Sequence, residues 1–197
     1  MTAVRSLFSR AHAQPRGFAA LAAAGLLPAQ AMAQGLPSME APSRGEGEGL
    51  LTTLQKEQGL ITASGHRLNE TRYAIAMGYA CPDSSHCDPQ YFGFATQVYY
   101  AARQFRIYEA RPDLFMTAAG REDFVPFAPG EECGGARIFV ENLATSNLYN
   151  YTPYQPNEAA LSGAGGPCAS VGNANFYAYF NAWFGTPEKA AESARLD

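Results

Sequence analysis

The residue best placed for acid–base chemistry is Glu57, which lies between Lys56 and Gln58 near the end of the apolar stretch LLTTLQKEQGLIT. A carboxyl group at the edge of an apolar core keeps its proton more readily than one in water, and a general acid needs that proton. Asp83 and Asp88 are the carboxylates available for a second, partnering role. The alternative interpretation is a solvated Glu57 on a polar helix face, because most glutamates are exposed.

Other familiar catalytic arrangements do not occur in the sequence. It contains no GxSxG motif, no glycine-rich phosphate loop and no HExxH motif. Four residues are candidate zinc ligands: His66, Cys81, His86 and Cys87. Their spacing matches no familiar zinc-ligand pattern. We therefore expect no metal ion and no cofactor, which leaves carboxylate chemistry.

The four cysteines allow three disulfide pairings, and the sequence alone does not choose among them. We predict Cys81 with Cys87, which closes the short loop CPDSSHC, and Cys133 with Cys168. The second bridge closes a long loop and would contribute roughly 3 to 4 kcal/mol in the chain-entropy description.

Tyrosine is plentiful, and its apolar face and polar tip suit a core as well as a groove that holds sugars. The segment YNYTPYQPN combines three tyrosines with amide side chains and two prolines. We predict that it lines a binding groove, with Tyr79 as a further candidate. The predicted ligand-binding residues are Tyr79, Tyr149, Asn150, Tyr151, Tyr154 and Gln155. The alternative is a proline-braced loop that packs on the core.

The first element that must position these residues is a helix over residues 50–60. Leu50, Leu51 and Leu54 lie on one side of it, and Gly59 is a plausible stop. Glu57 then falls in the last turn of an apolar helix.

The second predicted helix begins at Asp88, an N-cap followed by proline at the first helical position. It runs to about Ala110, where Pro112 ends it. Its predicted apolar stripe is Phe94, Val98, Ala101, Phe105 and Tyr108, widened by Tyr91, Ala95 and Ala102.

The C-terminal half predicts one short strand, residues 136–140, and then a helix that Asn142 caps and that runs through Tyr149. A last helix, residues 174–184, carries aromatic residues at helical spacing and should bury them in the core before Gly185 ends it. Helices dominate, so the predicted class is mainly α, with α+β as the alternative.

The N-terminal segment resembles an export signal. Residues 1–16 carry arginines and no acidic residue, residues 17–29 are apolar, and Ala31-Met32-Ala33 offers small residues for cleavage. The alternative is an ordinary amphipathic helix. The apolar run is too short to span a bilayer, so we expect no transmembrane segment, and an oxidising destination would suit disulfides.

Composition then divides the chain into a signal peptide (1–33), a flexible linker rich in Gly, Pro, Ser and Glu (34–49), one folded domain (50–185) and a C-terminal tail (186–197). The net charge of −4 is spread without long runs of one sign, which excludes the basic footprint of a nucleic-acid binder.

Longer stretches carry a resemblance to known proteins. LQKEQGLIT, MGYACPDSSHCDPQYFGFATQVYYAARQF, ENLATSNLYNYTPYQPN and NFYAYFNAWFG are similar to a group of actinobacterial secreted domains, often labelled hemagglutinin-like, found in cell-wall-associated proteins. They cover nearly all of residues 50–185. The shorter stretch around Glu57-Gln58-Gly59-Leu60 also resembles the end of the first active-site helix in lytic transglycosylases and goose-type lysozymes.

The resemblance implies a secreted or cell-wall-associated, lysozyme-like domain that acts on peptidoglycan or another cell-surface glycan as a monomer. It carries the catalytic acid over to Glu57, and one Glu suffices in a lytic transglycosylase, whereas a hydrolytic variant would use Asp83 or Asp88 as well. In this family ordered sequence precedes the Glu57 helix, but here a signal and a linker take that place. The alternative expectation is therefore a non-catalytic adhesin or envelope module that binds glycan.

Overall fold

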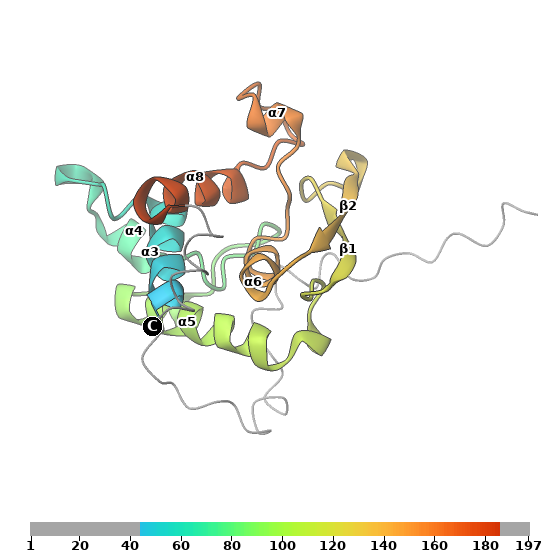
Figure 1. Ribbon diagram of the computed structural model, residues 1–197. Helices are drawn as coiled ribbons and strands as arrows, with labels where there is room; N and C mark the ends of the chain where they lie inside the picture. Colours follow the sequence, from blue (N-terminus) through green and yellow to red (C-terminus); the bar gives the residue numbers. More distant parts are fainter. Residues whose placement is uncertain (1–43, 186–197) are drawn as a thin grey trace, which may run out of the picture.

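The computed structural model describes residues 44–185 and is mainly helical, with one two-stranded antiparallel sheet (Figure 1). The predicted signal peptide (1–33), the first part of the predicted linker (34–43) and the predicted tail (186–197) lie outside the described residues. The helices are α3 (Arg44–Gln58), α4 (Glu70–Ala74), α5 (Phe94–Ala110), α6 (Leu143–Tyr151), α7 (Glu158–Leu161) and α8 (Gly172–Phe184). The strands are β1 (Arg121–Pro126) and β2 (Gly135–Val140). Short 3-10 helices are η1 (Gly65–Arg67), η2 (Pro89–Tyr91), η3 (Pro112–Leu114) and η4 (Glu131–Cys133).

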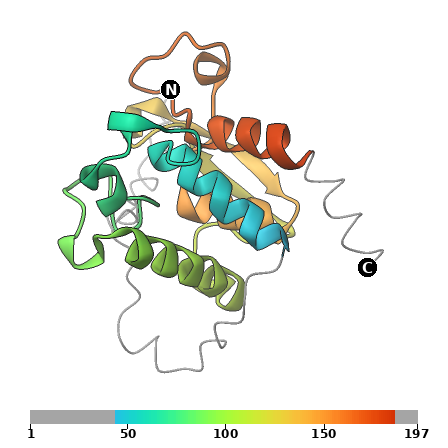
Figure 2. The same cartoon turned by 90° about the vertical axis from the view of Figure 1, so that its left-hand side faces the viewer.

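Helix α3 lies at the centre of the helical part, between α5 on one side and α8 on the other (Figures 1 and 2). Helix α6 packs against α5 and against β2, and so joins the helices to the sheet. The buried core cluster takes Leu54 from α3, Ala76 and Met77 from the segment after α4, and Ala101 from α5. Glu57 therefore lies beyond the core cluster, in the last turn of α3.

Helix α3 is longer than the sequence predicted. It begins at Arg44, so residues 44–49 belong to the helix and not to a linker. Its end agrees with the prediction, because Gly59 adopts a φ of +65° and its amide donates to the Gln55 carbonyl at 2.8 Å. Glu57 does lie in the last turn.

Helix α5 ends at Ala110 as predicted, but its start and its buried face differ. Asp88 caps only the short helix η2, and Gly93, with a φ of +108°, separates η2 from α5. The prediction of an apolar stripe was wrong at the helix start, where Phe94 is 44% exposed. Two glutamines, Gln97 and Gln104, are buried instead. The helical spacing of apolar residues did not predict the buried face correctly, because the inward face of α5 meets backbone polar groups as well as apolar side chains.

The sheet contains one strand that was predicted and one that was not. Strand β2 matches the predicted strand 136–140, and it pairs antiparallel with β1, with Arg121 opposite Val140 and Val125 opposite Ala136. The sequence REDFVP of β1 begins with three charged residues, so it lacks the apolar alternation of a typical strand. Val125 and Val140 are buried, and together they fix which face of the hairpin turns inward.

The last helices follow the predicted signals with two differences. Asn142 caps α6 by accepting a hydrogen bond from the Thr145 amide, but the helix continues to Tyr151, two residues further than predicted. In α8 the aromatic stripe predicted to lie in the core is half-buried. Its rings stack along the helix, as Phe176 does with Phe180 at 6.0 Å between centroids.

Both predicted disulfides are present: Cys81 is bonded to Cys87, and Cys133 to Cys168. The first closes the loop before η2, and the second ties η4 to the segment before α8. Among the described residues no helix is both long and apolar enough to cross a membrane.

Candidate active site

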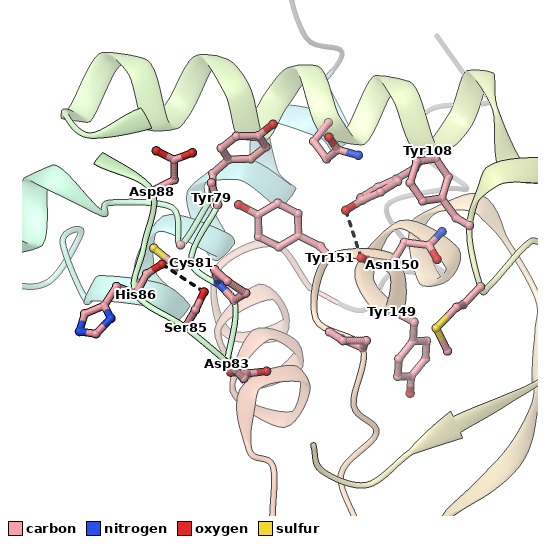
Figure 3. Close-up of a pocket in the computed structure, with 17 residues that line it drawn as sticks. Tyr79, Cys81, Asp83, Ser85, His86, Asp88, Tyr108, Tyr149, Asn150 and Tyr151 are labelled. Atoms are coloured by element: carbon pink, nitrogen blue, oxygen red, sulfur yellow. Dashed lines mark hydrogen bonds between the residues drawn. The ribbon is translucent and has the colours of Figure 1, made fainter. Parts of the chain in front are cut away.

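Two adjoining cavities lie beside the end of α3. The first, the Glu57 cavity, has a volume of about 350 Å³, and its polar lining includes Lys56, Glu57, Asp83, Thr152, Tyr154 and Ser170. The second, the tyrosine cavity, has a volume of about 290 Å³, and its aromatic lining is Tyr79, Tyr108, Phe115, Tyr149 and Tyr151 (Figure 3). The two cavities share Gly78, Cys81, Asp83, Tyr151 and Pro153, so they are neighbouring parts of one groove.

The Glu57 carboxylate lies in the wall of its cavity, with its side chain 25% exposed. Oε1 accepts from the Lys56 ammonium at 2.6 Å, and the Lys56 side chain is only 5% exposed. The ammonium also donates to the Thr152 hydroxyl and lies 5.9 Å from the centre of the Tyr151 ring. Three neighbours thus hold Lys56, and Lys56 in turn orients one oxygen of Glu57.

The other side of the Glu57 carboxylate rests against Gly78. A Cβ atom at position 78 would lie 2.7 Å from Glu57 Oε2 and 2.9 Å from its carboxyl carbon, which is closer than real Cβ contacts allow. Gly78 also has a φ of +69°, in the left-handed region that favours glycine. Both facts favour glycine where the backbone passes under the carboxylate, because an added Cβ would push the Glu57 side chain aside.

Asp83 is the carboxylate that the structure brings to the same cavity as Glu57. It comes from the loop closed by Cys81 and Cys87, and its Oδ2 accepts from the Tyr154 hydroxyl at 2.8 Å. Burial and the neighbouring Asp83 carboxylate raise the pKa of Tyr154, which keeps Tyr154 a neutral donor. Asp88 instead lines only the tyrosine cavity, and its side chain accepts from the Gln90 amide at 2.9 Å as the cap of η2.

Most polar groups in the tyrosine cavity are already used within the protein. Tyr151 donates to the Met77 carbonyl at 2.8 Å, and Tyr108 donates to the Asn150 carbonyl at 3.0 Å (Figure 3). Burial raises the pKa of Tyr79 to about 12, so this hydroxyl also stays protonated. Among residues 44–185 the Tyr149 hydroxyl has no hydrogen-bond partner, which makes it the tyrosine best suited to meet a ligand.

The predicted ligand-binding segment lines the two cavities only in part. Tyr149, Asn150 and Tyr151 belong to helix α6, and the Asn150 side chain is occupied by Thr117, from whose amide it accepts at 3.1 Å. Gln155 lines neither cavity. It is buried, and its amide donates to strand carbonyls of the hairpin. Tyr154 lines the Glu57 cavity, and Tyr149 lines the tyrosine cavity.

Sequence reasoning missed several residues that shape the site. Lys56 was noticed only as a neighbour of Glu57, and Gly78 and Gln97 were not considered. A glutamine within an otherwise apolar helical stripe, and a glycine in the buried stretch AIAMGYA, were the signals that could have found them.

The candidate zinc ligands do not form a site. No group of three or more His, Cys, Asp or Glu side chains in the described part of the chain is arranged to hold a metal ion. Cys81 and Cys87 are bonded to each other, and the His86 ring points away from the labelled tyrosines (Figure 3).

No protein-family model, curated protein or solved structure matches this chain.

Proposed function

We propose that this protein is exported and cleaves a glycan of the bacterial cell wall, with Glu57 as the acid and base. The observation that carries the proposal is the position of the Glu57 carboxylate in the wall of a cavity that Asp83 and Tyr154 also line. A pair of carboxylates at one cavity is the usual equipment of enzymes that hydrolyse a glycosidic bond. The disulfides and the resemblance to secreted cell-wall domains support export.

In this proposal Glu57 gives a proton to the oxygen of the scissile bond as the sugar leaves, and then takes a proton from the attacking hydroxyl. An ion pair requires an ionised carboxylate, whereas donation requires a protonated one. Glu57 must therefore take up a proton and loosen from Lys56 when the glycan binds. If the attacking hydroxyl is that of a water molecule, Asp83 is the carboxylate available to orient it.

A second function, glycan binding without cleavage, is favoured by a different observation. In the described structure both carboxylates are engaged, Glu57 with Lys56 and Asp83 with Tyr154. A groove that keeps these pairs intact can hold a sugar against Tyr149 and Tyr154 without breaking any bond.

Release of soluble fragments from purified cell walls tests the first function. We expect Glu57→Gln to lower the release rate by about 10²-fold to 10⁴-fold, because this change removes the transferable proton and leaves the shape. Asp113→Asn is the matched control, since Asp113 is also ion-paired, with Arg111 at 2.9 Å, but lines neither cavity. Unchanged release by the Glu57 variant would remove Glu57 from the reaction.

Sedimentation of the protein with the same walls tests the second function. Binding by the wild type with no release at any protein concentration would favour the binding module. Tyr149→Ala should then weaken binding, whereas Tyr177→Ala, an exposed tyrosine of α8, should not.

A further inference from the structure

Gln97, in the first turns of α5, is completely buried and makes hydrogen bonds with both ends of its amide. Its oxygen accepts from the Met77 amide at 3.2 Å and from the Tyr79 amide at 3.1 Å. Its nitrogen donates to the Tyr79 carbonyl at 3.0 Å and to the Tyr91 carbonyl at 2.8 Å. One side chain thus satisfies four backbone groups of two separate segments.

The segment that Gln97 holds is the one that touches Glu57. Gly78 lies between the two residues bonded to Gln97, and it is the residue against which the Glu57 carboxylate rests. The Tyr151 hydroxyl holds the same segment from the α6 side, through the Met77 carbonyl. A shift of this segment would move the surface under Glu57 Oε2, whereas Oε1 would keep its pair with Lys56.

We propose that Gln97 is a positioning residue for Glu57, which acts by fixing the backbone of Met77–Tyr79 and, through Gly78, the place of the carboxylate. This inference rests on the proposed function for its effect on turnover, but the contact itself does not depend on it. Gln97 itself lines neither cavity, so it acts only through the segment that it binds.

A comparison within α5 supports this specific role. Gln104 lies on the same side of the helix and is equally buried, and its amide lies near the Tyr108 hydroxyl. Yet neither amide atom of Gln104 makes a well-formed hydrogen bond among the described residues. Burial of a glutamine in α5 therefore does not by itself produce a backbone clamp, and the clamp is particular to the position that faces the Glu57 support.

The first test compares Gln97→Met with Gln155→Met. Both changes remove a buried amide that binds backbone groups, but Gln155 binds the hairpin and lines neither cavity. We expect kcat for wall cleavage to fall about 10-fold to 100-fold in Gln97→Met with KM changed less than about threefold, because a misplaced acid slows the chemical step. Gln155→Met should lose stability and keep kcat. Equal kcat values for both folded variants would overturn the proposal.

The second test perturbs the same contact by substituting Gly78. It can be used even if Gln97→Met does not fold. Gly165, with a φ of +71° and nothing within 4 Å of an added Cβ, is a matched control for Gly78 with its φ of +69°. Gly78→Ala and Gly165→Ala carry the same backbone strain, but only the first pushes on Glu57. Gly78→Ala should lower kcat at least about 10-fold relative to Gly165→Ala. Similar kcat values in the two variants would contradict the role of this segment.

A spectroscopic measurement separates this inference from the proposed function. In protein carrying ¹³C in its glutamate carboxyl groups, the Glu57 signal is the one that Glu57→Gln removes. We expect Gln97→Met, or Gly78→Ala if the former does not fold, to shift or broaden this signal, and the matched controls to leave it in place. A wild-type protein without wall-cleaving activity would defeat the proposed function and leave this readout intact, whereas an unmoved Glu57 signal would defeat the positioning role.

Discussion

Two regions of the molecule, the helical segment that supports Glu57 and the β1–β2 hairpin, are each held by a buried glutamine and a disulfide. On the helical side, Gln97 binds the backbone of residues 77–79 and 91, and a disulfide joins Cys81 to Cys87, six residues apart. On the hairpin side, Gln155 binds strand carbonyls 30 and 19 residues away, and a disulfide spans 35 residues. The two glutamines therefore act over similar distances along the chain, whereas one disulfide closes a short loop and the other a long one.

The difference in loop length indicates which of the two disulfides contributes more to stability. Long loops lose more conformational entropy on closing than short ones, so a bridge that spans them contributes more to stability. The hairpin side should therefore depend more on its disulfide than the support of Glu57 depends on the bridge between Cys81 and Cys87.

The largest effect is expected from the long bridge. Replacing Cys133 and Cys168 together by alanine should lower the free energy of unfolding by about 4 kcal/mol, since the bridge closes a loop of 35 residues. Urea unfolding followed by circular dichroism measures this loss. A smaller loss of stability than the one caused by removing the short bridge would contradict this comparison.

The next effect concerns the amide of the hairpin side. Gln155→Met should cost about 3 kcal/mol, because it leaves the Val125 and Ala136 carbonyls without this donor in a buried place. Gln104→Met is the control for stability alone, and it should cost little or even stabilise, since the Gln104 amide has no well-formed hydrogen bond among the described residues. Equal losses for the two variants in the same urea experiment would contradict the assigned contacts.

The short bridge should contribute less to the free energy of unfolding of the whole molecule. Its effect should be concentrated in the loop that it closes. Replacing Cys81 and Cys87 by alanine should cost about 2 kcal/mol, because the closed loop is short. Hydrogen exchange should accelerate at the amides of residues 81–88 and stay unchanged at those of the hairpin. Faster exchange in the hairpin would show that the two sides are coupled more closely than the bonding indicates.

The smallest effect is the share of Tyr79 in the dependence of stability on alkaline pH. Burial raises the pKa of Tyr79 to about 12, above the value of 10.0 for a free tyrosine. The folded state therefore holds its proton more tightly, so stability from this group is complete below pH 10.0 and is lost as the pH rises toward 12. At a pH midway between 10.0 and 12, the loss in the free energy of unfolding is on the order of 1 kcal/mol. Urea midpoints measured on both sides of pH 10.0 should show this fall, and Tyr79→Phe should reduce it.

Local signals in the sequence predicted the parts of the fold that depend on neighbouring residues. Asn142 begins a helix and Gly59 ends one, because a cap acts on backbone groups within a few positions of itself. The disulfide pairing also followed the prediction, with Cys81 bonded to its near neighbour and Cys133 to Cys168.

The rest could not be predicted because it depends on partners distant in the chain. Strand β1 is a strand because β2 offers hydrogen bonds, although its own charged residues do not favour one. Gln97 is buried because the backbone of Met77 and Tyr79 needs partners, which no periodicity within α5 can reveal. For the same reason Glu57 was found by its local motif, whereas the Gly78 support beneath it was not.

The crowding at position 78 also limits how this chain can change over evolution. Any side chain there would displace the Glu57 carboxylate, and any residue at 97 without both a donor and an acceptor would release the segment between them. Glu57, Gly78 and Gln97 thus form a three-residue signature of fixed spacing. If Glu57 acts as proposed, homologues with that activity should retain all three, and homologues that only bind glycan are free to lose the glycine.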